Sequence, residues 1–304
     1  MDTDMKTLIF IFLALNFVVP AQNGEKVERY PSGIVKEIKN FKNNKLDGLV
    51  RQYYPTGILA SSINYKSGVK DGELMNFDST GILKEYFIYT HDKLNGKFKT
   101  FYTGGKLREE GSYLDGVLYG DYVSYHDNGK IKSKSFFISG KLEGISFEYF
   151  ESGSLKGELL YSNGVQEGIT KWYYESGELL GEYPYTSSKI DGTVKEYYPS
   201  GKPKTVKDYI GSKAEGIHKT WFENGNLSSE ISYKNSLKVG PSKTWYESGK
   251  IWTEQTWVNN RLDGESKIYF ESGGLWSVDV YEKGVLKSSK EYDSLGKLIG
   301  EKVY

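Results

Sequence analysis

Histidine, carboxylate and lysine side chains are the groups of this sequence that could carry out acid–base chemistry or hold a metal ion. The three histidines, His91, His126 and His218, occupy three different places in a repeated pattern, in repeats that are not neighbours. No two of them have the spacing of a metal site or an acid–base pair, so we interpret them as turn or surface residues. The chain has no cysteine, which excludes disulfides and thiolate metal sites.

Two rows of charged residues recur once per repeat. The glutamate row contains Glu110, Glu158, Glu182, Glu230 and Glu254, and the lysine row contains Lys171, Lys195, Lys219, Lys243 and Lys267. Charges at such regular places keep a solvated sheet soluble and discourage pairing at its edges. The sequence shows no phosphate-binding loop, nucleophile elbow or zinc-ligand spacing. We therefore expect a protein that is not an enzyme and that uses no cofactor and no metal.

Two series of glycines predict the elements that position these side chains. Within each series the glycines are 24 residues apart, from Gly24 to Gly264 in the first and from Gly33 to Gly273 in the second. A fixed period of this size indicates a repeat protein. Eleven repeats run from Gly24 to Lys287, and a degenerate segment, 288–304, follows them. In that segment Ser288 stands where a glycine is expected, and Gly296 comes one residue early.

Aromatic and aliphatic residues recur at fixed places between the glycines. An aromatic residue such as Tyr53 stands four residues before the second glycine, and another, such as Tyr65, stands eight residues after it. A leucine or isoleucine, such as Leu59, stands two residues after it in most repeats. Short runs of this kind, bounded by Gly, Asn, Asp and Ser, predict strands joined by tight turns. We therefore predict two strands per repeat and an all-β fold.

Two kinds of turn follow from the spacing. The segment 55–57 predicts a three-residue hairpin loop in which the glycine is left-handed, so that Tyr53 faces Leu59. The pair 67–68 predicts a two-residue turn between repeats. The apolar rows can then share one face only if one extra residue is absorbed near the first glycine, so we predict a β-bulge there.

The predicted architecture is an elongated, single-layer antiparallel meander of β-hairpins with leucine and tyrosine rows along one face. Each repeat contacts mainly its neighbours, so stability should increase with repeat number and terminal repeats should be atypical. Roughly 22 strands at about 4.8 Å would extend on the order of 100 Å along the stacking direction.

The first 21 residues predict a secretory signal peptide. Lys6 precedes a short apolar run, 7–19, which ends at Pro20 and Ala21. An uncleaved membrane anchor is the alternative. Cleavage after Ala21 would leave 22–304 as the repeat domain, with no transmembrane span. We therefore expect export to the periplasm, the cell surface or the outside.

The overall charge limits the partners. Lysine plus arginine and aspartate plus glutamate both number 40, so the formal net charge is zero. There is therefore no overall basic field to attract nucleic acid or anionic lipid. We expect no nucleic-acid partner.

The repeat Gly-x4-aromatic-Tyr-Glu-Ser-Gly-Lys-Leu-x2-Glu-x2-Tyr-x-Asn-Gly is clearest at 144–167, 168–191 and 240–263. It resembles the bacterial MORN-repeat variant over essentially all of 22–304. The resemblance implies a hairpin-repeat scaffold. Bacterial members are often described as antitoxin components of toxin–antitoxin systems, and the wider MORN family as membrane-associated or dimerising scaffolds. It therefore implies a protein-binding scaffold, with an antitoxin as an alternative, and we also consider a homodimer formed through a sheet edge.

Residues that break the repeat are the candidates for binding. The residue three places after the second glycine is usually lysine, arginine or small, but it is tryptophan at Trp252 and Trp276. The register places their backbones about 10 Å apart on a face otherwise lined with Lys, Glu, Ser and Thr. On that face they join three further residues, Tyr246, Ile268 and Phe270.

Such an apolar patch is typical of an interaction site, or of a surface covered by a terminal segment, here 288–304. We expect a protein or a cell-envelope component as the partner. The alternative is carbohydrate, because tyrosine and tryptophan rings in secreted repeats can stack on sugar rings.

Overall fold

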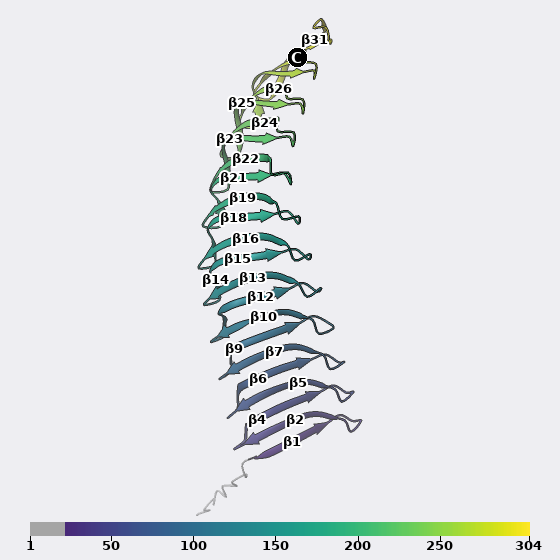
Figure 1. Cartoon of the computed structure of the whole chain (residues 1–304), viewed down its shortest axis with the longest axis vertical. Helices are drawn as coiled ribbons and strands as arrows, with labels where there is room; N and C mark the ends of the chain where they lie inside the picture. Colours follow the sequence, from purple (N-terminus) through teal and green to yellow (C-terminus); the bar gives the residue numbers. More distant parts are fainter. Residues whose placement is uncertain (1–21) are drawn as a thin grey trace, which may run out of the picture. The chain divides into compact units, whose positions relative to one another are not determined.

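The computed structural model of the protein describes residues 22–304, and the predicted signal peptide, 1–21, lies outside them. The described residues form strands and turns and contain no helix. They fall into two compact units, an N-terminal unit that ends at Lys93 and a C-terminal unit that begins at Leu94. Each unit is a single antiparallel layer of hairpins in which consecutive strands lie side by side (Figure 1). The predicted all-β hairpin fold is confirmed.

The strands of the N-terminal unit are β1 (Gly24–Arg29), β2 (Val35–Lys42), β3 (Lys45–Leu46), β4 (Gly48–Tyr53), β5 (Leu59–Lys66), β6 (Val69–Phe77) and β7 (Leu83–Thr90). The two-residue strand β8 (Lys93–Leu94) spans the division.

The C-terminal unit continues with β9 (Gly96–Phe101), β10 (Leu107–Leu114), β11 (Val117–Leu118), β12 (Gly120–Tyr125), β13 (Ile131–Ile138), β14 (Lys141–Leu142), β15 (Gly144–Tyr149), β16 (Leu155–Ser162), β17 (Val165–Gln166), β18 (Gly168–Tyr173), β19 (Leu179–Thr186), β20 (Lys189–Ile190) and β21 (Gly192–Tyr197). It ends with β22 (Pro203–Ile210), β23 (Lys213–Trp221), β24 (Leu227–Lys234), β25 (Leu237–Trp245), β26 (Ile251–Val258), β27 (Arg261–Leu262), β28 (Gly264–Tyr269), β29 (Leu275–Glu282), β30 (Val285–Tyr292) and β31 (Leu298–Val303).

A three-residue loop closes the hairpin of each repeat. In the loop 55–57, the Tyr54 amide donates to the Ile58 carbonyl at 2.8 Å and the Gly57 amide donates to the Tyr54 carbonyl at 2.8 Å. Gly57 has a φ of 83°, and every glycine of the second series from Gly33 to Gly273 is likewise left-handed. Glycine adopts this conformation without a Cβ clash, so the predicted loop is confirmed.

Directly after the loop, one residue of the second strand is extra. Tyr53 pairs with Leu59 as predicted, but the next pair joins Gln52 to Ser61. Ala60 is therefore a β-bulge, and the same shift recurs in the other repeats, as at Thr244/Trp245 of the C-terminal unit. The residue spacing did not predict this bulge.

Two-residue turns join successive repeats, and between the eleven repeats the strand after the turn carries two extra residues rather than the one predicted. Tyr65 pairs with Lys70, as expected for a two-residue turn, but Ile63 pairs with Leu74. The extra residues surround Gly72, whose φ is 122°. An insertion of two residues preserves the alternation of side chains, whereas an insertion of one would reverse it.

The apolar rows consequently lie on both faces of the sheet. Phe98 pairs with Gly111, and its ring centroid lies 4.9 Å from that of Tyr113. The Tyr125 hydroxyl instead donates to Glu110 Oε1 at 2.7 Å. Because Glu110 and Gly111 are consecutive in one strand, their side chains point to opposite faces. The prediction that all leucine and tyrosine rows share one face is therefore wrong.

We call the face that carries Phe98 the core face and the face that carries Glu110 the charged face. The buried apolar residues of both units project from the core face: Val50 and Ile63 in the N-terminal unit, and Phe98, Leu159 and Val194 in the C-terminal unit. Aromatic residues of the Tyr65 row stand beside them. The core is thus one line of side chains per unit along the middle of the strands.

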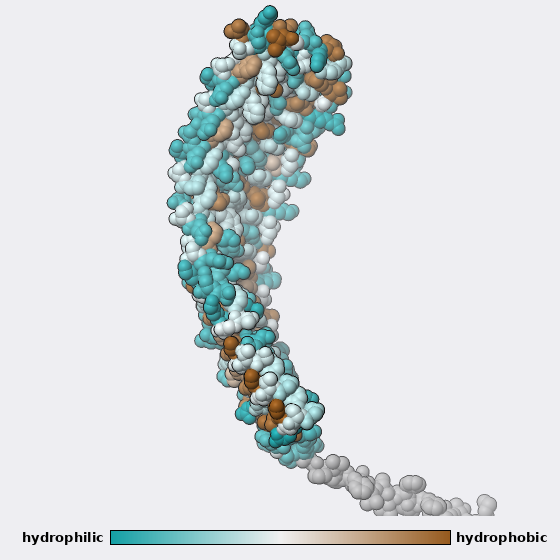
Figure 2. Space-filling view, turned by 90° about the vertical axis from the view of Figure 1, so that its right-hand side faces the viewer, coloured by the Kyte–Doolittle hydropathy of each residue, from teal (hydrophilic) through white to brown (hydrophobic). Residues whose placement is uncertain are grey.

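The degenerate segment forms one more hairpin of the same kind. Strands β30 and β31 are closed by the loop 294–296, with Gly296 at a φ of 83°. Tyr281 pairs with Leu286 and Val280 pairs with Ser288, so this junction contains one extra residue instead of two. The loop glycine therefore comes one residue early. Figure 2 shows hydrophobic side chains at this end of the chain, where Leu295, Ile299 and Val303 are well exposed.

Candidate functional site: an aromatic pocket at the loop end of the sheet

An open pocket of about 470 Å³ lies at the loop end of two successive repeats in the C-terminal unit. Its lining residues, which we call the aromatic pocket, are Phe222, Ser228, Ser229, Thr244, Trp245, Tyr246, Glu247 and Trp252. Two rows of the repeat supply its aromatic walls. We call them the pre-loop row, three residues before the second glycine, and the bulge row, three residues after it.

The tyrosines of the pre-loop row are held by hydrogen bonds to the next repeat, whereas Phe222 and Phe270 of the same row have no hydroxyl to form one. The Tyr246 hydroxyl donates to the Tyr269 carbonyl at 2.8 Å. The same bond, 23 residues along the chain, is made by Tyr30, Tyr54, Tyr102, Tyr174 and Tyr198. Each of these tyrosine rings therefore has a fixed position at the loop end. This role was not predicted from the sequence, although a tyrosine stands beside the loop in six of the eleven repeats.

The bulge row places Trp252 and Trp276 beside the pre-loop rings. Both are the extra residue of a β-bulge, so neither has a partner residue across the strand pair. The Trp252 ring centroid lies 5.8 Å from that of Tyr246, and the Trp276 ring stacks on Phe270 with centroids 5.7 Å apart. Trp252 is 45% exposed and Trp276 is 46% exposed.

The third predicted neighbour, Ile268, lies on the same face. It pairs with Thr253 and Ser277 in the strands on either side and is half-buried. The structure thus brings Trp252 to Tyr246 and Trp276 to Phe270 on the core face, with Ile268 on that face as well. The expectation that this face is otherwise polar is wrong, because it also carries the buried core.

The terminal segment does not cover the tryptophans. Residues 288–304 extend the sheet as β30 and β31, with β30 paired to β29. Trp252 and Trp276 keep almost half of their surface accessible. An interaction surface fits this arrangement better than a terminal cap does.

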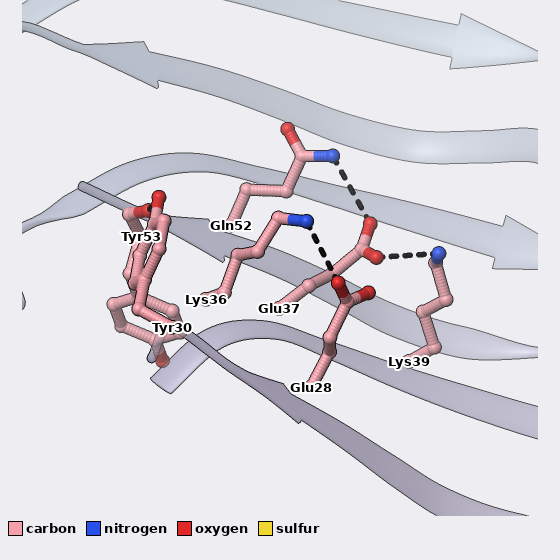
Figure 3. Close-up of polar contacts among 7 residues, drawn as sticks. All are labelled: Glu28, Tyr30, Lys36, Glu37, Lys39, Gln52 and Tyr53. Carbon is pink, nitrogen blue, oxygen red and sulfur yellow. Dashed lines mark hydrogen bonds and ion pairs between the residues drawn. The ribbon is translucent and has the colours of Figure 1, made fainter. Parts of the chain in front are cut away.

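The N-terminal unit contains a pocket built from the same rows but with polar walls. This pocket, of about 420 Å³, is lined by Tyr30, Lys36, Glu37, Gln52, Tyr53, Tyr54 and Ala60, and we call it the polar pocket. Figure 3 shows Lys36 directed at Glu28, and Glu37 directed at Gln52 and Lys39, with Tyr30 and Tyr53 to one side.

Hydrogen bonds and ion pairs join these polar groups to one another and to the neighbouring Glu28 and Lys39. Lys36 Nζ donates to Glu28 Oε1 at 2.7 Å, and Gln52 Nε2 donates to Glu37 Oε1 at 3.0 Å. Lys39 also forms an ion pair with Glu37. The hydrogen bond and charge of Lys36 lower the pKa of Glu28. Burial opposes ionisation of Glu37, but the hydrogen bonds from Lys39 and Gln52 outweigh it and lower the pKa of this carboxyl.

The charged face pairs the glutamate and lysine rows. Lys219 contacts Glu230 at 3.1 Å and Lys243 contacts Glu254 at 2.8 Å. The hydrogen bond from Tyr125 lowers the pKa of Glu110, and burial together with that hydrogen bond raises the pKa of Tyr125 to about 12. These groups are partly exposed and pair with one another, so we interpret them as structural.

The histidines have three different environments. His91 is an exposed turn residue with a φ of 48°, and His126 belongs to the pre-loop row, where its Nε2 lies 3.0 Å from the Tyr149 carbonyl. His218 is buried on the core face, with its ring centroid 4.5 Å from that of Tyr233, so its prediction as a surface residue is wrong. Within residues 22–304, no group of three or more His, Asp or Glu side chains is placed to hold a metal ion.

A second apolar surface, which the sequence analysis also missed, lies on the charged face. We call it the apolar strip, and it consists of Phe136, Ile145, Leu160 and Ile169. Ile145 pairs with Leu160, whose side chain lies over Gly168, directly before Ile169. Ile145 is 52% exposed and Ile169 is 55% exposed. The signal was the isoleucine after the first glycine in two successive repeats, at a place where five of the other nine repeats have Glu, Lys or Asp.

A family model described as the MORN repeat variant matches this chain nine times, over more than half of its length. The matched segments are 22–43, 46–67, 94–115, 118–139, 142–163, 166–186, 190–210, 214–235 and 238–259. The chain belongs to this family. The protein is therefore a MORN-repeat scaffold. Two repeats lie outside the matched segments, around 70–91 and from Gly264 to Lys287, and both fold as hairpins. In the first, Asp78 stands in place of the pre-loop tyrosine and accepts the Thr80 and Ile82 amides.

Similar solved structures add little. The crystal structure of TcdB2-TccC3-Cdc42 is 12% identical with a TM-score of 0.17, and the match covers 89% of this chain and 16% of that one. The crystal structure of TcdB2-TccC3-TEV is 13% identical with a TM-score of 0.18, covering 88% and 16%. Such scores say nothing useful about fold or function. No curated protein matches the sequence. Among the described residues there is no helix that could span a membrane.

Proposed function

We propose that this MORN-repeat protein is an exported, non-enzymatic scaffold that binds a protein partner through the aromatic pocket and the adjoining Trp276. The observation that supports the proposal is the pair of tryptophans, which stand almost half-exposed against rings of the pre-loop row. Exposed aromatic residues held in fixed positions are typical of the centres of protein interfaces, where tryptophan and tyrosine contribute most of the binding energy.

Charge and hydroxyl groups in the pocket support binding rather than catalysis. The Thr244 hydroxyl lies 2.6 Å from that of Thr253, and the Thr220 hydroxyl lies 2.7 Å from that of Ser229. These hydroxyls are therefore paired within the sheet. Glu247 is the one carboxylate that lines the pocket, so the pocket lining holds no acid–base pair.

The binding proposal can be tested by capturing the partner from an envelope extract with purified 22–304 and with two double variants. Replacing Trp252 and Trp276 by lysine should abolish capture, while replacing Ile145 and Ile169 by lysine in the apolar strip should leave it unchanged. Both variants should unfold at the midpoint of the wild-type chain. The opposite pattern of capture would place the binding surface on the charged face and overturn the proposal.

Export is supported by the composition of residues 7–21 and is tested separately. The mature protein recovered from the envelope or the medium should have the mass of a chain that begins at Gln22. An intact N-terminus in that fraction, starting at Met1 or Met5, would overturn cleavage after Ala21.

A further inference from the structure

We infer that the partner segment bound by the aromatic pocket is a basic, proline-rich chain in the polyproline II conformation, running from repeat to repeat across the loop ends. This inference rests on the proposed function and names the chemistry of its partner. It is carried by three features of the C-terminal unit: the spacing of the rings, the hydrogen-bonding state of the indoles, and the charge of the loops.

The spacing of the pocket walls matches the pitch of such a ligand. Each repeat contributes two strands, so equivalent side chains of successive repeats are about 10 Å apart. The pocket lies between the pre-loop rings Phe222 and Tyr246, and Phe270 follows one repeat later. A polyproline II helix has three residues per turn and advances about 9 Å in that turn. Every third residue of the ligand can therefore face an equivalent position on successive repeats.

The rings offer the contacts that this conformation needs. Polyproline II segments dock in grooves lined by aromatic residues and expose carbonyl groups that lack internal hydrogen bonds. Within residues 22–304, neither the Trp252 nor the Trp276 indole N–H donates a hydrogen bond, whereas the Trp257 indole donates to Ser242 at 2.8 Å. The two exposed indoles can thus donate to ligand carbonyls while their rings contact proline.

The charge around the pocket favours a basic ligand. The first loop position is glutamate in three successive repeats, at Glu223, Glu247 and Glu271, and all three are exposed. In the same repeats the bulge row holds Ser228, Trp252 and Trp276 instead of its usual cation. In the polar pocket, by contrast, the first loop position is proline and the bulge row holds Lys36. The aromatic pocket therefore has an acidic rim that complements arginine or lysine beside the prolines.

The test is a titration of purified 22–304, followed by tryptophan fluorescence. The probe is a synthetic peptide of about twelve residues, all proline except for arginines at both ends, and the control peptide has glycine in place of each proline. The proline peptide should bind saturably and at least tenfold more tightly than the glycine peptide. A chitin hexasaccharide should not bind.

Matched variants separate ring contacts from charge. Trp252→Lys with Trp276→Lys should weaken binding of the proline peptide at least tenfold, and Trp252→Phe, which keeps a ring but removes the donor, should weaken it less. Glu247→Gln with Glu271→Gln should weaken binding several-fold at low salt. Glu151→Gln with Glu175→Gln, at the same loop position in repeats whose bulge row holds Lys156 and Leu180 instead of tryptophan, should have no effect. Circular dichroism of each variant confirms that it is folded.

Equal affinity for the two peptides would show that only the charge of the arginines is recognised, and it would overturn the inference. Binding of the hexasaccharide with the same dependence on Trp252 would assign the pocket to a glycan. If neither peptide binds but partner capture still depends on the tryptophans, the scaffold proposal stands and the polyproline assignment fails. If neither peptide binds and partner capture does not depend on the tryptophans, both the proposed binding site and the polyproline assignment are overturned.

Discussion

The polar pocket of the N-terminal unit and the aromatic pocket of the C-terminal unit are built from the same rows of the repeat. Tyr54 and Tyr246 occupy the same place in the pre-loop row and make the same hydrogen bond to the following repeat. The bulge row differs, with Ala60 in one pocket and Trp252 in the other. The comparison separates residues that build the sheet from residues that set the chemistry of its surface.

Polar groups are used differently in the two pockets. In the polar pocket Gln52 and Glu37 are directed at each other across neighbouring strands. At the corresponding places of the aromatic pocket stand Thr244 and Ser229, whose short hydroxyls pair within the sheet. Because these small side chains do not reach outward, the aromatic rings are left facing solvent. A few substitutions in variable rows thus convert a self-satisfied surface into one with exposed rings.

The largest expected effect concerns the loops, which both pockets share. Replacing Gly153 by valine should destabilise the protein by about 2 kcal/mol, because its φ of 91° places a β-branched side chain in the left-handed region. Gly57→Val and Gly249→Val, in the loops of the two pockets, should cost similar amounts. Denaturant unfolding measures all three, with Ser152→Ala as the control, which should be nearly neutral. Equal midpoints for Gly153→Val and Ser152→Ala would contradict the loop assignment.

A smaller effect is expected in the pre-loop row. Tyr54→Phe and Tyr246→Phe each remove one hydrogen bond to the next repeat, at 2.8 Å in both pockets, and each should cost about 1 kcal/mol. Equal losses in the two pockets, measured by denaturant unfolding, would show that this row is scaffolding. A much larger loss at Tyr246 would show instead that the ring stabilises the aromatic pocket itself.

Acid should affect the polar pocket. The pKa values of Glu28 and Glu37 are lowered in the folded protein, so their contribution is present above the ordinary carboxyl pKa of 4.5 and is lost as the pH falls through the folded-state values. Hydrogen exchange of β1 and β2 should therefore accelerate between pH 5 and pH 3, relative to the intrinsic rate. Glu28→Gln with Glu37→Gln should remove most of this dependence, and a dependence that persists would assign it to other carboxyls.

The smallest effect is expected when the tryptophan of the aromatic pocket is introduced at the equivalent place in the polar pocket. Ala60→Trp should change stability by no more than about 0.5 kcal/mol, because Ala60 has no cross-strand partner and lines an open pocket that has room for the ring. Partner binding by a chain that also carries Trp252→Lys and Trp276→Lys should not be restored, since the polar pocket lacks the acidic loops. Restored capture would show that a tryptophan in the bulge row is sufficient by itself.

Much of this fold could be predicted from the amino-acid sequence. The 24-residue period, the two strands per repeat and the left-handed glycines follow from residue types and spacing, because glycine has few other reasons to recur so regularly. The pairing of Tyr53 with Leu59 follows from the loop length alone. The sequence also identified Trp252 and Trp276 as departures from the repeat. These features are local, so they can be derived without the rest of the structure.

The faces of the sheet were decided only by the tertiary structure. Which face a row occupies depends on how many residues each bulge inserts. The structure has two extra residues around Gly72 and one at Ala60, whereas the sequence predicted one extra residue near the first glycine. The spacing of the residues is the same in both cases, so it cannot distinguish them. The burial of His218 and the bond from Tyr246 to Tyr269 depend on the same register between repeats. A shift of one residue reverses every side chain beyond it, so an error of one insertion moves whole rows to the other face.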